Sequence, residues 1–421
     1  MLNAVSSFLL IAMSNSVATQ AQPSPHAGQE IRSPFGGQQT IVVTGDRIAD
    51  YRRRLAECIA RHCPPNEDIE ATTALAGALF VANEYRDART VLLASIGRNR
   101  REAENFPVPV SELYRANALV ARHLGFDADA QRSTWEILHA LQRGIQVEDS
   151  RHFTARLEVI ESLIAFGEYY QARDQIRELA SRARAAGRDD VVTIAEMRGF
   201  WLEYIQAPDS NEVVRELITL SGSADARRSL SAKRLLIRIY SARGQLREAN
   251  ALIEGLGVTG TRRLLLVAPA FDVAQQDNLV ATTNRTVNGT TNSPPPRPGQ
   301  NPPSQLLAAN IADRMTDIYD QTIDVGFRIK PDGTVTEVEV VNRRGAPGWE
   351  APLIRSISGR RYAIAADGSE TYRIERYTYT AERRTQGLSG THISNRSPRG
   401  RVEYRELSET NVPATPRTGS P

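Results

Sequence analysis

The two cysteines of this 421-residue chain are the residues whose spacing most directly suggests chemistry. They are Cys58 and Cys63, five positions apart in ECIARHCPP. A metal site would need two more ligands, and His62 is the only candidate that lies close by. In an oxidising compartment, two cysteines at this spacing can close a small loop, provided that the helix ends near Arg61. We therefore predict a disulfide; two unrelated thiols are the alternative.

Residue types that serve catalysis in other proteins show no recognisable arrangement here. The sequence contains no glycine-rich phosphate loop, no Gly-x-Ser-x-Gly elbow and no His-Glu-x-x-His pair. The histidines have no metal-ligand spacing; they are His26, His62, His123, His139, His152 and His392. His123 and His139 fall within helical stretches, where packing or solvation is expected. We predict a protein that is not an enzyme and that uses no cofactor and no metal.

Composition excludes further classes of function. Hydrophobic residues make up 41% of the chain and charged residues 24%, as in an ordinary globular protein. The formal net charge of +3 gives no argument for nucleic-acid binding. Lys233 and Lys330 are the only lysines, so 50 of the 52 basic residues are arginine, a bias that we attribute to a GC-rich genome.

The first residues, MLNAVSSFLLIAMSNSVATQAQ, resemble an export signal. An apolar run from Ala4 to Met13 has the length of a signal-peptide core and about half of the ~20 residues that a membrane span needs. Cleavage could follow Ala18 or Ala21, although no Lys or Arg precedes the apolar run. We predict a signal peptide at 1–21 and a periplasmic protein that meets the membrane only peripherally, through its partners.

Beyond the signal, the chain divides by composition. We expect a disordered leader at 22–45, a helical domain at 46–257 and a linker at 258–303 that ends in a proline cluster. A small α+β domain at 304–384 and a disordered tail at 385–421 follow. The leader ends in TIVVTG, an isolated β-favouring segment whose backbone groups could pair with a sheet edge. Its candidate strand-donor residues are Ile41, Val42, Val43 and Thr44.

One phrase recurs in the helical domain. It reads NEYRDARTVLL, GFDADAQRSTW, GEYYQARDQIR and GQLREANALIE, in each case a helix end, a turn and a new helix. The sixth residue of each phrase is a small one, namely Ala88, Ala130, Ala172 and Ala249. The separations are 42, 42 and 77 residues, and a degenerate repeat around FWLEYIQAPDSNEVVRELITL would fill the last gap. Small residues at a fixed helical position let stacked helices approach closely.

This pattern resembles the tetratricopeptide repeat. Ala76 and Ala118 match its small residue on the first helix, and the four alanines above match its small residue on the second helix. The chain departs from the family in its period, which is 42 residues rather than the usual ~34. It also departs at Ile160 and Ile237, which occupy the first-helix position in two repeats. The resemblance implies an all-α, tetratricopeptide-like solenoid with a concave groove for a protein partner; an irregular helical bundle is the alternative.

The α+β domain resembles a second family. QTIDVGFRIKPDGTVTEVEVVNRRG alternates across a turn at Pro331–Gly333, which predicts a hairpin. PGWEAPLIRSISGRRY then places Trp349, Leu353, Ile354 and Ile357 on one helical face. AADGSETYRIERYTYTA adds a last strand. This ββαβ order over 318–383 is similar to that of the TonB C-terminal domain. The energy-transducing members of that family keep an N-terminal membrane anchor, and in its place we expect this chain to have a signal peptide and a helical array.

The TonB resemblance implies binding of a peptide by strand addition. We expect the last strand to form a free edge whose partner-binding residues are Thr371, Tyr372, Arg373, Ile374, Tyr377 and Tyr379. The tyrosines alternate, so packing on a half-buried strand is the plainer reading. The combined hypothesis is a periplasmic protein-binding adaptor linked to TonB-dependent outer-membrane transport, with receptors or TonB as partners. The alternative is a structural envelope protein that binds peptidoglycan or an envelope assembly.

Overall fold

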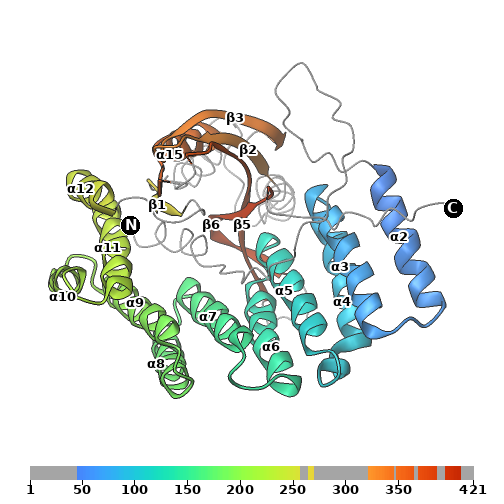
Figure 1. The fold of residues 1–421 in the computed structure, drawn as a ribbon. Helices are drawn as coiled ribbons and strands as arrows, with labels where there is room; N and C mark the ends of the chain where they lie inside the picture. The colour runs from blue at the N-terminus through green and yellow to red at the C-terminus, as the bar shows by residue number, and fades with distance from the viewer. Residues whose placement is uncertain are drawn as a thin grey trace, which may run out of the picture.

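The computed structural model describes residues 45–256, 264–269, 321–345, 348–364, 368–385 and 394–408. The predicted signal peptide, the candidate strand donor Ile41–Thr44 and the proline cluster lie outside these residues. The first described range contains helices and their connecting turns and no strand (Figure 1). Its elements are α2 (Gly45–Ala60), α3 (Pro65–Val81), α4 (Tyr85–Asn99), η2 (Arg100–Ala103), α5 (Pro107–His123), α6 (Asp127–Gly144), α7 (Ser150–Ala165), α8 (Tyr169–Ala185), α9 (Asp189–Gln206), α10 (Glu212–Ser221), α11 (Ala226–Ala242) and α12 (Leu246–Leu256).

From α3 onward the helices form hairpins joined by tight turns. Gly125 and Gly167 stand at equivalent positions of two hairpins, with φ of +76° and +77°, a backbone conformation that glycine adopts without steric cost. After Gly125, the amide of Phe126 donates to the carbonyl of Ala121 at 2.8 Å, and Glu168 makes the equivalent bond after Gly167. These bonds satisfy carbonyl groups at the helix end, as in the Schellman motif. The turn glycines therefore end one helix and set the direction of the next.

The small residues of the recurring phrase lie where close packing requires them. Ala88, Ala130, Ala172 and Ala249 are each 0% exposed, on the second helix of their hairpins. The degenerate repeat expected between the last two is the hairpin of α9 and α10. The structure thus shows the expected helical array, preceded by α2.

The remaining elements form a small antiparallel module. Its main sheet has the order β3-β2-β5-β6, with β2 at Thr322–Ile329, β3 at Val335–Arg344, β5 at Thr371–Thr385 and β6 at Ser394–Glu406. A second sheet pairs β1 (Leu265–Val267) with β4 (Arg361–Tyr362). The predicted hairpin joins β2 to β3, where the amide of Lys330 donates to the carbonyl of Thr334 at 2.8 Å. The predicted helix is α15 (Glu350–Ser358), with Leu353 and Ile357 buried against the sheet.

Two strands lie outside the expected α+β domain, 304–384, and a third, β4, lies inside it between the predicted helix and the predicted last strand. β6 falls in the expected disordered tail, 385–421, and β1 falls in the expected linker, 258–303. The sequence of β6, SNRSPRGRVEYRE, carries few apolar residues, of which Val402 and Tyr404 pack on the module core. The module is therefore larger than the predicted ββαβ unit, and its last strand is β6.

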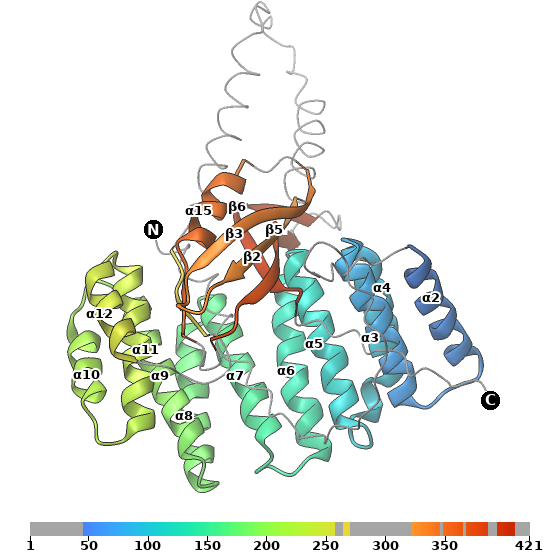
Figure 2. The same ribbon diagram turned by 45° about the horizontal axis from the view of Figure 1, so that its top comes forward.

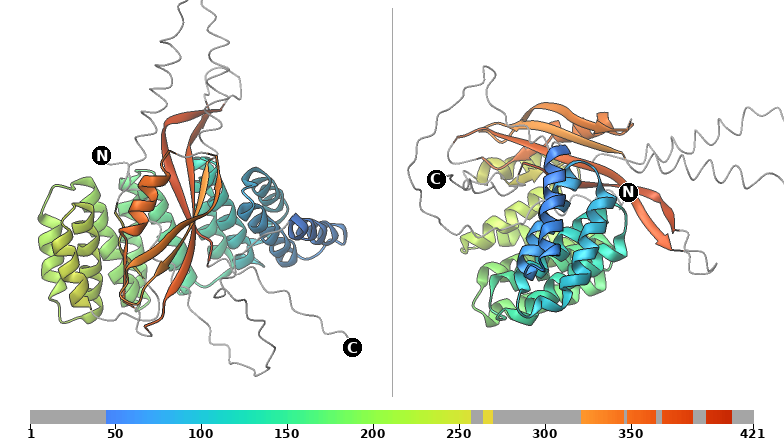
Figure 3. Two further views of the ribbon diagram at one scale, coloured as in Figure 1. Left: turned by 90° about the horizontal axis from the view of Figure 1, so that it is seen from above. Right: turned by 90° about the vertical axis from the view of Figure 1, so that its right-hand side faces the viewer.

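The helical array curves around the module. In Figure 1 the helices form an arc from α2 to α12 and the strands lie on its inner side. Figure 2 shows the sheet across one rim of the array, and Figure 3, from above, shows it crossing the row of helices. The expected concave side of the array is thus lined at least partly by the chain's own C-terminal region.

Candidate functional site

The module contacts the array where two helical hairpins turn, and we call this contact the docking interface. It joins β5 and β6 to the α3–α4 and α5–α6 turns. At its centre lies Arg376 of β5, 1% exposed, whose guanidinium donates to both carboxylate oxygens of Asp324 at 2.7 Å. It also donates to the carbonyl oxygens of Phe80 and Val81, at 2.5 and 2.9 Å. Those carbonyls belong to the last two residues of α3, and the Phe80 carbonyl also accepts from the Asn83 amide at 3.0 Å. Arg376 thus caps a helix of the array with a charge of favourable sign.

Next to Arg376, His123 lies at the end of α5 and is 3% exposed. Its Nδ1 is 2.9 Å from the Thr378 hydroxyl, which also lies 3.2 Å from the Tyr85 hydroxyl. The imidazole packs edge-on against the ring of Phe80, with 4.9 Å between ring centroids. Burial is the main cause that lowers the pKa of His123 to about 3. The histidine is therefore neutral at physiological pH and serves packing, as the sequence suggested.

Four charged side chains form a network on the β6 side of the interface. Arg122 of α5 donates to Glu403 at 2.7 Å, and Arg401 of β6 donates to Asp127 at 2.7 Å and to Glu403 at 2.6 Å. Burial by itself raises the pKa of Glu403, but Arg122 and Arg401 outweigh burial and hold that pKa at about 2. The network thus ties β6 to the array through ionised groups that are mutually paired.

The backbones of the two parts also touch. A Cβ atom added to Gly125 would lie 2.0 Å from the carbonyl oxygen of Ala381, so only glycine fits there. The amide of Arg383 donates to the carbonyl of Gly125 at 2.8 Å, and its Nε donates to the carbonyl of Leu124 at 3.1 Å. The guanidinium of Arg383 lies over the ring of Phe126. This turn therefore has two functions, ending α5 and receiving β5.

A second contact joins the module to the far end of the array. Leu266 and Val267 of β1 are each 4% exposed and pack with Ile237 of α11 and Ala249 of α12. β1 pairs with β4, and the amide of Ala363 donates to the carbonyl of Leu264 at 2.7 Å. The module thus contacts the first hairpins through β5, β6 and Arg344 at the end of β3, which donates to the Asn83 carbonyl at 3.1 Å, and the last hairpin through β1. The composition of the expected linker, 258–303, would by itself suggest two domains that move independently, and these contacts instead hold the module against the array.

The predicted partner-binding residues all lie on β5, but β5 is not a free edge. It pairs with β2 on one side and with β6 on the other. Tyr377 and Tyr379 are buried in the module core, at 1% and 2% exposure. Thr371 pairs with Ile329 of β2. The other three predicted residues, Tyr372, Arg373 and Ile374, contact Glu339, Glu406 and the array core, respectively. The expected edge is thus occupied by β6, which lies in the expected disordered tail, 385–421.

A buried polar network in the module was not foreseen from the sequence. Arg360 donates to Glu375 at 2.6 Å and to the Tyr377 hydroxyl at 2.6 Å, and the Tyr404 hydroxyl donates to Glu375 at 2.8 Å. The side chains of Arg360 and Glu375 are 0% and 1% exposed. Burial raises the pKa of both tyrosines well above the usual value. In the sequence, Arg360 stands out only as part of GRRY, and its carboxylate partner, Glu375, lies on β5. Because the groups are enclosed and paired, we assign the network to structure.

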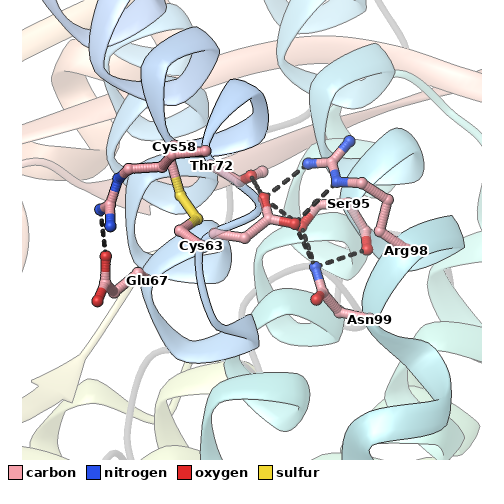
Figure 4. Close-up of a disulfide and its surroundings, with 9 residues drawn as sticks. Cys58, Cys63, Glu67, Thr72, Ser95, Arg98 and Asn99 are labelled. Atoms are coloured by element: carbon pink, nitrogen blue, oxygen red, sulfur yellow. Dashed lines mark hydrogen bonds and ion pairs between the residues drawn. A yellow bond between two sulfur atoms is a disulfide. The ribbon is translucent and has the colours of Figure 1, made fainter.

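The predicted disulfide is present. Cys58 and Cys63 are bonded, with their Cα atoms 5.1 Å apart, at the turn between α2 and α3 (Figure 4). Nearby, the buried carboxylate of Asp68 accepts from Arg98 at 2.6 and 2.8 Å and from Asn99 at 2.7 Å. Burial alone raises the pKa of Asp68, but these donors lower it overall. The start of the array is thus held by one covalent bond and one charged cluster.

Neither a metal centre nor a membrane span is found among the described residues. No group of three or more His, Cys, Asp or Glu side chains in these ranges could hold a metal ion. No helix there is long and apolar enough to cross a bilayer.

Comparison with known proteins gives little more. No protein-family model matches the chain, and no curated protein matches it. A solved structure described as the crystal structure of BtubC (BKLC) from P. vanneervenii aligns with 61% of this chain and 96% of its own, at 15% identity and a TM-score of 0.37. A likeness of that strength carries no argument. The chain is therefore described by its architecture, a mostly helical array with a small antiparallel module.

Proposed function

We propose that the chain is a non-enzymatic protein-binding adaptor of the periplasm, linked to TonB-dependent outer-membrane transport. In this proposal the array is tetratricopeptide-like, the module is TonB C-terminal-like, and the array presents the module to a partner. The observation that carries the proposal is the sheet order β3-β2-β5-β6, in which β3 is an end strand with β2 on one side only. An end strand can take up an extended segment through its backbone groups.

The side chains of β3 fit a receiving strand better than those of β6. Val338 and Val340 are half-buried, and Val341 is 39% exposed beside Gly326. β6 instead directs Arg401 and Glu403 into the docking interface, and these contacts restrict its movement. We therefore assign strand addition to β3 and no longer to Thr371–Thr380 of β5.

Capture of receptors tests this assignment. The mature chain is immobilised and exposed to a detergent-solubilised outer-membrane fraction, alongside a Val341→Lys variant, whose charge should discourage strand pairing. An Ile218→Lys variant is the matched control, because Ile218 is a 50% exposed apolar residue on α10. Receptors should be captured by the wild type and the control but not by Val341→Lys. Capture by all three proteins would refute the β3 assignment, and co-sedimentation with cell wall without receptors would favour the structural envelope role.

A further inference from the structure

A cavity of about 590 Å³ lies between α4, η2, α5 and α6. None of its lining residues belongs to the docking interface, so it stays available while the module is docked. Its volume lies within the range of ~300–1,000 Å³ that is usual for ligand sites.

The rim of the cavity is basic. Arg100, Arg101 and Arg143 are exposed lining residues, and within the described part of the chain no carboxylate pairs with any of them. The acidic residues of the lining are Asp129 and Glu136, and Asp129 is already paired with Arg89 and Arg132. Two arginines lie near the Tyr114 ring: burial and Glu136 raise the pKa of Tyr114, and Arg100 and Arg143 oppose that rise. The rim therefore favours an anionic ligand.

The lining also holds a buried acceptor without a donor. Asn117 is 2% exposed and donates through Nδ2 to Ser133 at 2.8 Å, but its Oδ1 has no hydrogen-bond partner among the described residues. Leaving such an atom unpaired is unfavourable, and a ligand that supplies a donor would relieve that cost. A carboxylate or a fully ionised phosphate cannot supply one, whereas a peptide N–H can. The ligand should thus carry an amide donor as well as a negative charge.

Apolar surface completes the description. Leu93, 40% exposed, and Ile96 line the cavity on the α4 side. Guanidinium groups, an amide acceptor and aliphatic side chains together match a peptide that carries both acidic and apolar side chains. We propose that this cavity binds an acidic peptide segment of a partner protein, independently of strand addition at β3.

Fluorescence anisotropy with defined peptides tests the proposal. The probe is a labelled, N-acetylated hexapeptide of alternating leucine and aspartate, added to the mature full-length chain; the matched probe replaces each aspartate with asparagine. We expect the acidic probe to bind at least about tenfold more tightly. Arg100→Ala and Arg143→Ala should each weaken its binding by about fivefold, as loss of a partly exposed charged contact would. Arg184→Ala is the control, since Arg184 is another exposed arginine of the array, on α8.

Three results would overturn the assignment. Equal binding of the two peptides would show that charge is not recognised. Equal loss of binding in Arg184→Ala would show that net charge, and not this cavity, attracts the probe. If inorganic phosphate displaced the probe in buffers held at constant ionic strength, the cavity would be a site for small anions and not for a peptide. The side-chain amide resonance of Asn117 gives a readout that does not depend on the arginines: it should shift with the acidic peptide and not with phosphate.

Discussion

Replacing Gly125 with alanine should loosen the module from the array, and the chain contains its own control. Gly125 and Gly167 have nearly the same backbone conformation, with φ of +76° and +77°, at equivalent turns of successive hairpins. A Cβ atom at Gly125 would lie 2.0 Å from the Ala381 carbonyl oxygen, whereas one at Gly167 would meet nothing within 4 Å. The two substitutions therefore share one cost, backbone strain, and differ in a second, contact with the module.

The magnitudes follow from these contacts. Placing alanine in the left-handed conformation costs roughly 1–2 kcal/mol at either position. At Gly125 the clash must also be relieved by moving β5, which breaks the bonds from Arg383 to the carbonyls of Gly125 and Leu124. Each such bond has a net value of about 0.5–1.5 kcal/mol, so the extra cost should be about 1–3 kcal/mol. Gly125→Ala should thus lose about 2–5 kcal/mol in total, against about 1–2 for Gly167→Ala.

Hydrogen exchange separates the two costs. The backbone amide of Arg383 is bonded across the interface, so its exchange should become about 10–100-fold faster in Gly125→Ala, the equivalent of 1–3 kcal/mol. In Gly167→Ala the same amide should exchange at the wild-type rate. Urea unfolding gives the total cost for each variant. Equal stability loss in the two variants, with Arg383 equally protected, would refute the docking interface as described.

Three further predictions follow from the same structure. Ala130→Leu should lower the free energy of unfolding by roughly 1–3 kcal/mol through overpacking, because Ala130 is 0% exposed, whereas Arg132→Leu, at 73% side-chain exposure, should change the melting temperature little. Equal melting temperatures for Ala130→Leu and the wild type would contradict the assigned positions of the repeats. Reduction of the Cys58–Cys63 disulfide should cost about 2 kcal/mol or less, given its short loop, and mass spectrometry without reductant should find the native peptide two hydrogens light; two alkylatable thiols would exclude the bond. Folding lowers the pKa of His123 from 6.5 to about 3, so the stability that the neutral imidazole contributes is complete above pH 6.5 and is lost as the pH falls. Between pH 6.5 and 5, urea unfolding should therefore show a loss of unfolding free energy that approaches ~1.4 kcal/mol per pH unit, and His123→Leu should reduce that loss.

The parts of the fold that could be predicted from the sequence are those encoded over short distances. The buried alanines recur at fixed positions along neighbouring helices, and the turn at Pro331–Gly333 contains all the residues that it needs. The disulfide likewise closes within six residues of chain, from Cys58 to Cys63. Periodicity and turn chemistry act locally, so a single sequence displays them.

The docking interface could not be found in this way. Arg401 pairs with Asp127, which lies 274 positions earlier in the chain, and neither residue has an unusual local context. β6 is hard to recognise for a related reason: Arg401 and Glu403 are bound to the array, so the apolar alternation is limited to Val402 and Tyr404, which pack on the module core. The sequence does predict a glycine in the turn at Gly125, because the end of a helix is by itself sufficient reason for one. The close approach of Ala381 is a second reason, and it is evident only in the three-dimensional structure.

The contacts at both ends of the array change how it should respond to force and to ligands. In an open solenoid each repeat touches only its neighbours, so the ends can bend and fray separately. Here the module spans the arc, from the turns of α3 and α5 to α11, and so acts as a cross-brace. Any change in the curvature of the arc must change the distance between those contact points and therefore strain the sheet that connects them. Curvature and sheet geometry are then thermodynamically linked, and a partner that bends the helices alters the affinity of the strands by the same coupling free energy.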